Sequence, residues 1–116
     1  MNVSIRGELD AQSLEEMRCK AEEATAFLKA LAHEGRLMIL CHLATGEKSV
    51  SELETLIGVA QATVSQQLAR LRHAGFVESR RSGKEVIYSL SDGPVLEMIG
   101  NLYDIFCAPG GPGGRG

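Results

Sequence analysis

Apolar and polar residues recur with a helical period in two short runs that are separated by a glycine. In the first run, Ser49 is followed three residues later by Glu52, which is the capping-box pattern that opens a helix. The apolar face behind it is formed by Leu53, Leu56 and Ile57. Gly58 then supplies the residue type that ends many helices in the left-handed conformation. The pattern predicts a short helix after Ser49 that ends at Gly58.

The second run predicts a helix from residue 60 or 61 to His73, with an apolar stripe formed by Val64, Leu68 and Leu71. The opposite face is polar but nearly uncharged, and it consists of Gln61, Thr63, Gln66, Gln67 and Arg70. A solvated helix face usually carries Glu and Lys, whereas Gln, Thr and Ser offer the donors and acceptors that read base edges in the major groove. This face fits a DNA-reading helix, and it fits equally a polar surface helix of a small bundle.

Residues 76–90 predict a two-stranded hairpin. Strand-forming side chains fill residues 76–80 and 86–90, and the turn is expected at residues 81–84. Arg80, Arg81 and Lys84 gather near its tip. Such cations either contact the phosphate backbone or the minor groove of DNA, or they keep an exposed hairpin solvated.

Apolar patterns with a helical period also flank this central part. Upstream they predict a long helix from residue 10 or 13 to residue 32 and a second helix over residues 35–44, and downstream a last helix from Pro94 to Cys107. The first and last helices carry more apolar residues than a peripheral helix needs, so each packs into the core or forms the seam of a dimer. Residues 10–107 are therefore interpreted as one domain. Residues 1–9 are expected to be mobile, and the Gly/Pro-rich residues 108–116 are expected to be disordered.

Composition and charge change this picture in two respects. The 116-residue chain has a net charge of −3, yet residues 61–90 hold five cations and two anions. An acidic body with one basic face is expected to bind random DNA weakly, with an affinity that falls steeply with salt. No apolar run approaches membrane-spanning length and no signal peptide is recognisable, so a cytoplasmic protein without a membrane partner is expected. Three cysteines, an odd number, suit free thiols in a reducing compartment.

Three stretches of the chain resemble ArsR-type winged-helix repressors. Residues 30–40 (ALAHEGRLMIL) are similar to the opening of that family's DNA-binding domain, and residues 64–77 (VSQQLARLRHAGFV) to its recognition-helix signature. The Gly83-Lys84 pair, with Tyr88-Ser89-Leu90 behind it, is similar to the family's wing. The resemblance covers about residues 25–106. It implies a mainly α-helical winged helix-turn-helix fold of four helices, a β-hairpin wing and a fifth helix, assembled as a homodimer through its first and last helices.

The same resemblance implies a transcriptional repressor that binds an inverted-repeat operator in double-stranded DNA. The residues predicted to face DNA in or near the major groove are Thr63, Ser65, Gln66, Gln67 and Arg70. Arg80, Arg81 and Lys84 are predicted to contact the backbone from the wing. The chain has no C-x-x-C pair and no arrangement of the Ser-His-Asp kind, which argues against a thiol enzyme. A winged helix that makes only protein contacts is the remaining alternative.

Many repressors of this family sense metals, but the metal-site positions are not matched here. Where one family site has two thiolates, residues 47–53 carry Ser49 and Ser51, which are poor ligands for soft or borderline metals. A second family site needs His on the last helix, and residues 94–107 contain none. We therefore expect neither a metal nor another cofactor, although a metal-sensing repressor is kept as an alternative.

Two of the three cysteines suggest a different effector. By itself, each of Cys41 and Cys107 fits a buried thiol that packs like a small apolar side chain. By position in the fold, however, the pair matches the dithiol of the sulfide- and persulfide-responsive repressors in the family. The resemblance thus implies that reactive sulfur species bridge Cys41 and Cys107 and release the operator, with Cys19 outside the pattern. A repressor that senses peroxide or general thiol oxidants through the same two thiols is the alternative.

Overall fold

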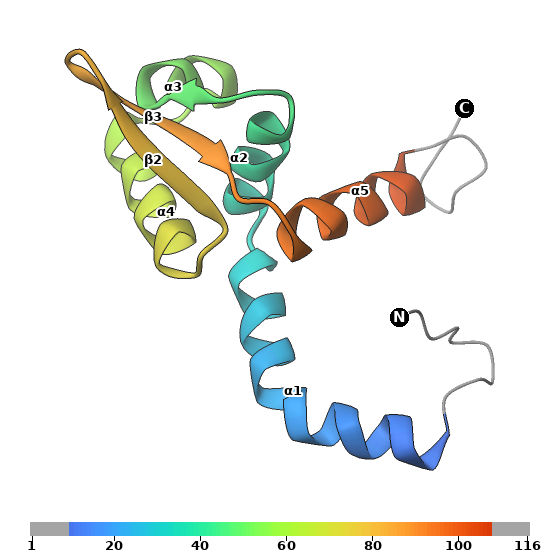
Figure 1. The fold of residues 1–116 in the computed structure, drawn as a ribbon. Helices are drawn as coiled ribbons and strands as arrows, with labels where there is room; N and C mark the ends of the chain where they lie inside the picture. Colours follow the sequence, from blue (N-terminus) through green and yellow to red (C-terminus); the bar gives the residue numbers. More distant parts are fainter. Residues whose placement is uncertain (1–9, 108–116) are drawn as a thin grey trace.

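The computed structural model describes residues 10–107, which fold into five helices and a small antiparallel sheet (Figure 1). The predictions of a mobile segment at 1–9 and a disordered tail at 108–116 lie outside the described residues. In chain order the elements are α1 (Ala11–Leu31), α2 (Glu34–Ala44), β1 (Lys48–Ser49), α3 (Val50–Ile57), α4 (Gln61–His73), β2 (Val77–Ser82), β3 (Glu85–Leu90) and α5 (Pro94–Phe106). The predicted mainly α-helical winged helix-turn-helix fold is confirmed.

The ends of α3 follow the predicted capping pattern. The backbone N–H of Glu52 donates to Ser49 Oγ at 3.1 Å, and the backbone N–H of Ser49 donates to Glu52 Oε1 at 2.8 Å. These reciprocal bonds satisfy two donors that a helix start otherwise leaves open. At the other end, Gly58 has φ = 84° and its N–H donates to the carbonyl of Glu54. The capping box and the glycine stop together limit α3 to two turns and aim the chain into α4.

Two other helices also begin at side-chain caps. The carboxylate of Asp10 accepts from the backbone N–H of Ser13 at 2.8 Å and opens α1. The Nδ1 atom of His33 accepts from the backbone N–H groups of Gly35 and Arg36 and opens α2. The predicted starts and ends of these helices agree with the structure to within about the residue or two by which helix limits are ordinarily defined.

The sheet differs from the predicted hairpin in two ways. It has three strands in the order β1-β3-β2, because Lys48 and Ser49 pair with Tyr88 and Ile87. The sequence analysis missed β1, since two residues are too short to show a period. The predicted turn at 81–84 is also wrong, because Arg81 pairs with Val86 and lies within β2. The connection is shorter, and Gly83 has φ = 65°, which a tight hairpin turn requires and a glycine adopts without strain.

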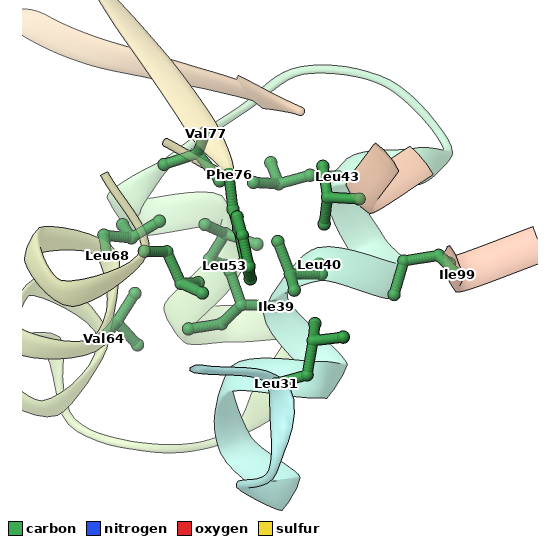
Figure 2. Close-up of a cluster of buried hydrophobic side chains, with 12 residues drawn as sticks. Leu31, Ile39, Leu40, Leu43, Leu53, Val64, Leu68, Phe76, Val77 and Ile99 are labelled. Atoms are coloured by element: carbon green, nitrogen blue, oxygen red, sulfur yellow. The ribbon is translucent and has the colours of Figure 1, made fainter. Parts of the chain in front are cut away.

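The hydrophobic core lies between α2, α3, α4 and the start of β2 (Figure 2). The predicted stripe of α4, Val64, Leu68 and Leu71, is fully buried there. The core consists of Leu31, Ile39, Leu40, Leu43, Leu53, Val64, Leu68, Leu71, Phe76, Val77, Val95 and Ile99. Burying a leucine of this kind stabilises the fold by about 1.5–3 kcal/mol, so this cluster fixes α4 against α2 and α3.

The two flanking helices contact the core mainly through one end and then extend away from it (Figure 1). On α1 only Leu31 is buried, while Leu14, Met17 and Leu28 are each more than half exposed. On α5 the exposed apolar residues are Leu96, Tyr103, Ile105 and Phe106. Ordinary core packing therefore does not explain the apolar face of α1. Within residues 10–107, no helix is sufficiently long and apolar to cross a membrane.

Candidate nucleic-acid interface and thiol site

Helix α4 presents its polar face outward because its apolar stripe is fixed in the core. Val64 and Leu68 are fully buried, which directs the opposite side of the helix to solvent. Four of the five residues predicted to face the major groove are exposed on α4: Thr63, Ser65, Gln66 and Arg70. With α3 behind it, α4 has the placement of the second helix of a helix-turn-helix unit, whose exposed residues contact base edges.

The fifth predicted residue, Gln67, lies differently. It is half-buried, and its Oε1 accepts a hydrogen bond from Arg36 Nη1 at 3.3 Å. Its amide oxygen is thus already engaged inside the protein, which leaves the amide NH₂ as its remaining donor group. Sequence analysis did not single out Arg36 as functional. The two residues are separated by 31 positions, and local periodicity carries no information about such a contact.

The wing presents its cations on two faces. Arg80 and Arg81 are consecutive on β2, so their side chains project to opposite sides of the hairpin, and Lys84 lies at its turn. All three are exposed. Arg80 forms an ion pair with Glu47, which precedes β1, whereas Arg81 and Lys84 have no carboxylate partner within residues 10–107. A hairpin with cations on both faces suits insertion between two strands of phosphates.

Cys41 and Cys107 line the same cavity. This cavity has a volume of about 650 Å³ and lies between α2 and α5. Its walls are mostly apolar and consist of Leu37, Met38, Cys41, Ala44, Thr45, Leu96, Ile99, Gly100, Leu102, Tyr103, Asp104, Phe106 and Cys107. Cys41 is half-buried in the middle of α2, while Cys107 is exposed at the end of α5. Two thiols that are 66 positions apart in the chain are thus brought to one site.

The two thiols differ in their surroundings. Burial raises the pKa of the Cys41 thiol, and the neighbouring Cys107 raises it further, because two thiolates repel each other. Cys107 is the thiol that a dissolved reagent reaches first, since it is exposed. Such a pair is suited to sequential chemistry, in which one sulfur is modified and the second attacks afterwards.

The remaining candidate positions lie apart from this site. Cys19 is exposed on α1 and does not line the cavity. In the part of the chain that the structure describes, no three His, Cys, Asp or Glu side chains are grouped so that they could hold a metal ion. Ser49 is buried and caps α3, so its hydroxyl has a structural role.

Comparison with known proteins gives a consistent set of relatives. Residues 33–79 match the family described as "Bacterial regulatory protein, arsR family". The chain is 47% identical over 94 residues to the biofilm growth-associated repressor of Xylella fastidiosa, and the alignment covers 81% of this chain and 82% of that protein. Among solved structures, it is similar to the transcriptional repressor BigR from Xylella fastidiosa, with a TM-score of 0.75 and 47% identity over 81% of this chain and 96% of that one.

A second solved structure, reduced HlyU from Vibrio cholerae, is similar with a TM-score of 0.76 and 40% identity, covering 81% of this chain and 99% of that one. The residues matched to the family extend from the N-cap of α2 into β2. They include α3 and α4, the pair of helices that presents the candidate DNA-contacting face.

Proposed function

The chain belongs to the arsR family of bacterial regulatory proteins and is a DNA-binding transcriptional repressor rather than an enzyme, and we propose that the state of Cys41 and Cys107 sets its affinity for operator DNA. The reduced homodimer binds an inverted-repeat operator. Persulfide sulfur converts the two thiols to a covalent bridge, and the operator is released. The single observation that supports this switch is the cavity between α2 and α5, which both thiols line.

In the proposed complex, α4 lies in the major groove and the hairpin contacts the flanking backbone. Thr63, Ser65 and Gln66 offer hydroxyl and amide groups to base edges, and Arg70 offers a guanidinium. Arg80, Arg81 and Lys84 contact phosphates from the wing. One such helix reads only a few base pairs, so specificity requires two copies about one helical turn apart on one face of the duplex.

A two-fold homodimer supplies the second copy. The exposed apolar residues of α1 and α5 support this assembly, because large apolar side chains that gather on a surface favour contact with another protein surface. Leu14, Met17 and Leu28 mark the α1 part of the proposed interface, and Tyr103 and Phe106 the α5 part. Since α5 carries Cys107 at its end, the proposed thiol site is continuous with the proposed dimer interface.

The proposed chemistry needs no oxidant beyond the persulfide itself. The Cys107 thiolate attacks the terminal sulfur of a donor R–S–SH, so that a new S–S bond forms at Cys107 and RS⁻ leaves. The Cys41 thiol gives its proton to solvent and attacks Sγ of Cys107, and the outer sulfur leaves as HS⁻, which gives a disulfide. If both cysteines are persulfidated first, the perthiolate of one attacks Sγ of the other. The outer sulfur of the attacked persulfide leaves as HS⁻, and the product is a trisulfide bridge. In each route the two thiols lose two electrons and one sulfane sulfur is reduced to sulfide; the trisulfide route consumes two donor molecules and keeps the second sulfane sulfur in the bridge.

The length of the bridge depends on how far the two cysteines must move toward each other. A disulfide needs Cα atoms within about 7 Å, and each inserted sulfur extends the reach by roughly 2 Å. Either bridge ties α2 to α5 and so biases the dimer toward a spacing that no longer fits two half-sites. A coupling of about 1–3 kcal/mol, or about 5–150-fold in affinity, is sufficient to empty an operator.

The test uses the duplex that the reduced wild-type protein selects from a random-sequence library. DNA affinity and intact mass are measured before and after treatment with glutathione persulfide. Wild type and the matched control Cys19→Ser are expected to lose affinity and to gain an intrachain bridge, while Cys41→Ser and Cys107→Ser keep their affinity. Loss of DNA affinity by Cys41→Ser or by Cys107→Ser under the same treatment would contradict the proposal.

The same measurement separates the peroxide alternative. Under persulfide, mass increments of whole sulfur atoms support the proposed effector. A loss of two hydrogens under hydrogen peroxide, with release of DNA equal to that under persulfide, would instead assign the switch to general thiol oxidation.

A further inference from the structure

Arg36 connects three helices through one side chain. It lies in the first turn of α2, and its guanidinium donates to backbone carbonyls of α1 from two nitrogens. Nε reaches the carbonyl of Ala30 at 2.7 Å, and Nη2 reaches that of Lys29 at 3.1 Å. The third nitrogen, Nη1, donates to Gln67 Oε1 on α4 at 3.3 Å. The last turn of α1 is thereby joined to the DNA-facing helix.

The carbonyls that Arg36 contacts lie at the end of a helix. The last carbonyls of a helix have no partner within it, and the helix dipole places partial negative charge there. The guanidinium of Arg36 bonds to both carbonyls, of which that of Lys29 also accepts from the backbone N–H of Ala32, and its planar fork fixes direction in a way that an ammonium cannot. Arg36 therefore acts on the direction in which α1 leaves the core.

Packing alone constrains that direction little. Leu31 is the only buried residue of α1, and the other notable core contact is the Phe27 ring, which lies edge-on against Phe76 with centroids 5.1 Å apart. The remaining length of α1 extends away from the core (Figure 1). A small rotation at residues 29–31 is thus amplified along the rest of the helix.

Arg36 is also held in place from its own backbone. Its N–H donates to Nδ1 of the capping His33 at 3.3 Å. Its side chain is half-buried, and within residues 10–107 it forms no ion pair with a carboxylate. All hydrogen-bond partners of its guanidinium among these residues are neutral oxygens, which is the arrangement of a structural clamp rather than of a free surface charge.

We propose that Arg36 is a positioning residue that fixes α1 relative to α4, and through the dimer sets the spacing of the two α4 helices on DNA. The proposal rests on the proposed function in one respect, that the dimer pairs through α1 while α4 contacts DNA. It does not depend on the thiol chemistry. The two half-sites must lie about one helical turn apart. A change in the angle between α1 and α4 therefore weakens binding to the full operator more than binding to a half-site.

The test compares Arg36→Met and Arg36→Lys with the matched control Arg18→Met. Arg18 is an exposed arginine of α1 whose side chain, among residues 10–107, bonds only to Glu15 of the same helix. Probes are the library-selected duplex, a single half-site, and duplexes whose central spacer is shortened or lengthened by single base pairs. Both Arg36 variants are expected to lose on the order of tenfold affinity for the full duplex. Half-site affinity and the salt slope are expected to stay unchanged, and the preference for one spacer length to broaden.

A second variant keeps the test informative if Arg36→Met does not fold. Gln67→Met removes the α4 end of the clamp together with the amide NH₂ of that residue, so the readout is the spacer preference rather than the affinity itself. It is expected to broaden spacer preference in the same way and to have no additional effect on spacer preference in the Arg36→Lys background. Independent, additive effects of the two substitutions on spacer preference would overturn the clamp.

Three further results would overturn the proposal. A decrease in the salt slope of about 0.9 for each lost contact would make Arg36 a direct phosphate contact. An equal loss of affinity for the half-site and for the full duplex would mean that Arg36 stabilises α4 alone and does not set the spacing. A spacer preference like that of Arg18→Met would leave it without a positioning role. If instead wild type selects no duplex, it is the proposed function that fails, whatever the variants do.

Discussion

The substitution Arg81→Ala tests the proposed role of the wing. Arg81 is exposed on β2, lies opposite Val86 and has no carboxylate partner within residues 10–107. Its removal leaves the core and the pairing of the strands unchanged. The expected effect is therefore confined to the electrostatic part of DNA binding, which depends on how many phosphates the protein neutralises.

The magnitude follows from the number of contacts that are lost. Each neutralised phosphate contributes about 0.9 to the slope of log affinity against log salt concentration. A dimer carries Arg81 twice, so the slope is expected to become shallower by about 1.8. Between about 50 and 200 mM salt, the variant should then lose about twelvefold less affinity than wild type.

Fluorescence anisotropy of a labelled duplex, titrated at several salt concentrations, measures both slopes. Arg18→Ala, on α1, is the matched loss of charge and should leave the slope unchanged. Glu47→Gln is the opposite change, because it frees Arg80 from its ion pair. It should raise affinity for any duplex by up to about fivefold per protomer, given the roughly 0–1 kcal/mol typical of exposed pairs. A slope for Arg81→Ala equal to that of wild type would refute a phosphate contact by Arg81.

Three further predictions concern stability and thiol reactivity. Ser49→Ala removes the capping box with Glu52 and should lower the free energy of unfolding by about 1 kcal/mol in urea denaturation at fixed protein concentration; an unchanged midpoint would contradict the role of the cap. Leu68→Ala should cost about 2–5 kcal/mol in the same assay, because the side chain is fully buried, and a smaller loss would mean that the core collapses around the cavity. Because burial raises the pKa of Cys41, its thiolate fraction is low at neutral pH and grows as pH rises. Conversion of a Cys107 persulfide to the bridge should therefore accelerate between about pH 7 and 9, and a rate that is flat over this range would exclude Cys41 as the attacking thiol.

The elements with a regular local pattern were predictable from the sequence. The capping box at Ser49 and Glu52, the stop at Gly58 and the stripe of Val64 and Leu68 all appear where local chemistry placed them. These features depend on contacts within a few residues, so that periodicity and cap preferences carry the information. The limits of the hairpin were less predictable. Arg81 adjoins the turn residues Ser82 and Gly83 in the sequence, yet it pairs with Val86 and so belongs to β2.

The contacts that join distant segments were not predictable in this way. The hydrogen bond from Arg36 to Gln67 and the ion pair of Arg80 with Glu47 span 31 and 33 positions, and no local pattern records them. Each involves a residue predicted to face DNA, Gln67 or Arg80, and each engages a group that the residue would otherwise offer to DNA. The cavity shared by Cys41 and Cys107 is of the same kind, and the resemblance to a family, rather than spacing or composition, suggested that the two thiols act together.

The central claim is that a bridge between Cys41 and Cys107 lowers affinity for the operator. The most direct test measures both quantities in the same samples, with the bridged fraction taken from peptide mass spectrometry and the DNA-binding fraction from anisotropy, over a series of persulfide doses. The account predicts that the DNA-binding fraction falls in proportion to the bridged fraction, and that reduction of the bridge restores it. Bridged protein that binds the duplex as tightly as reduced protein, or binding that is lost while both thiols remain free, would contradict the account.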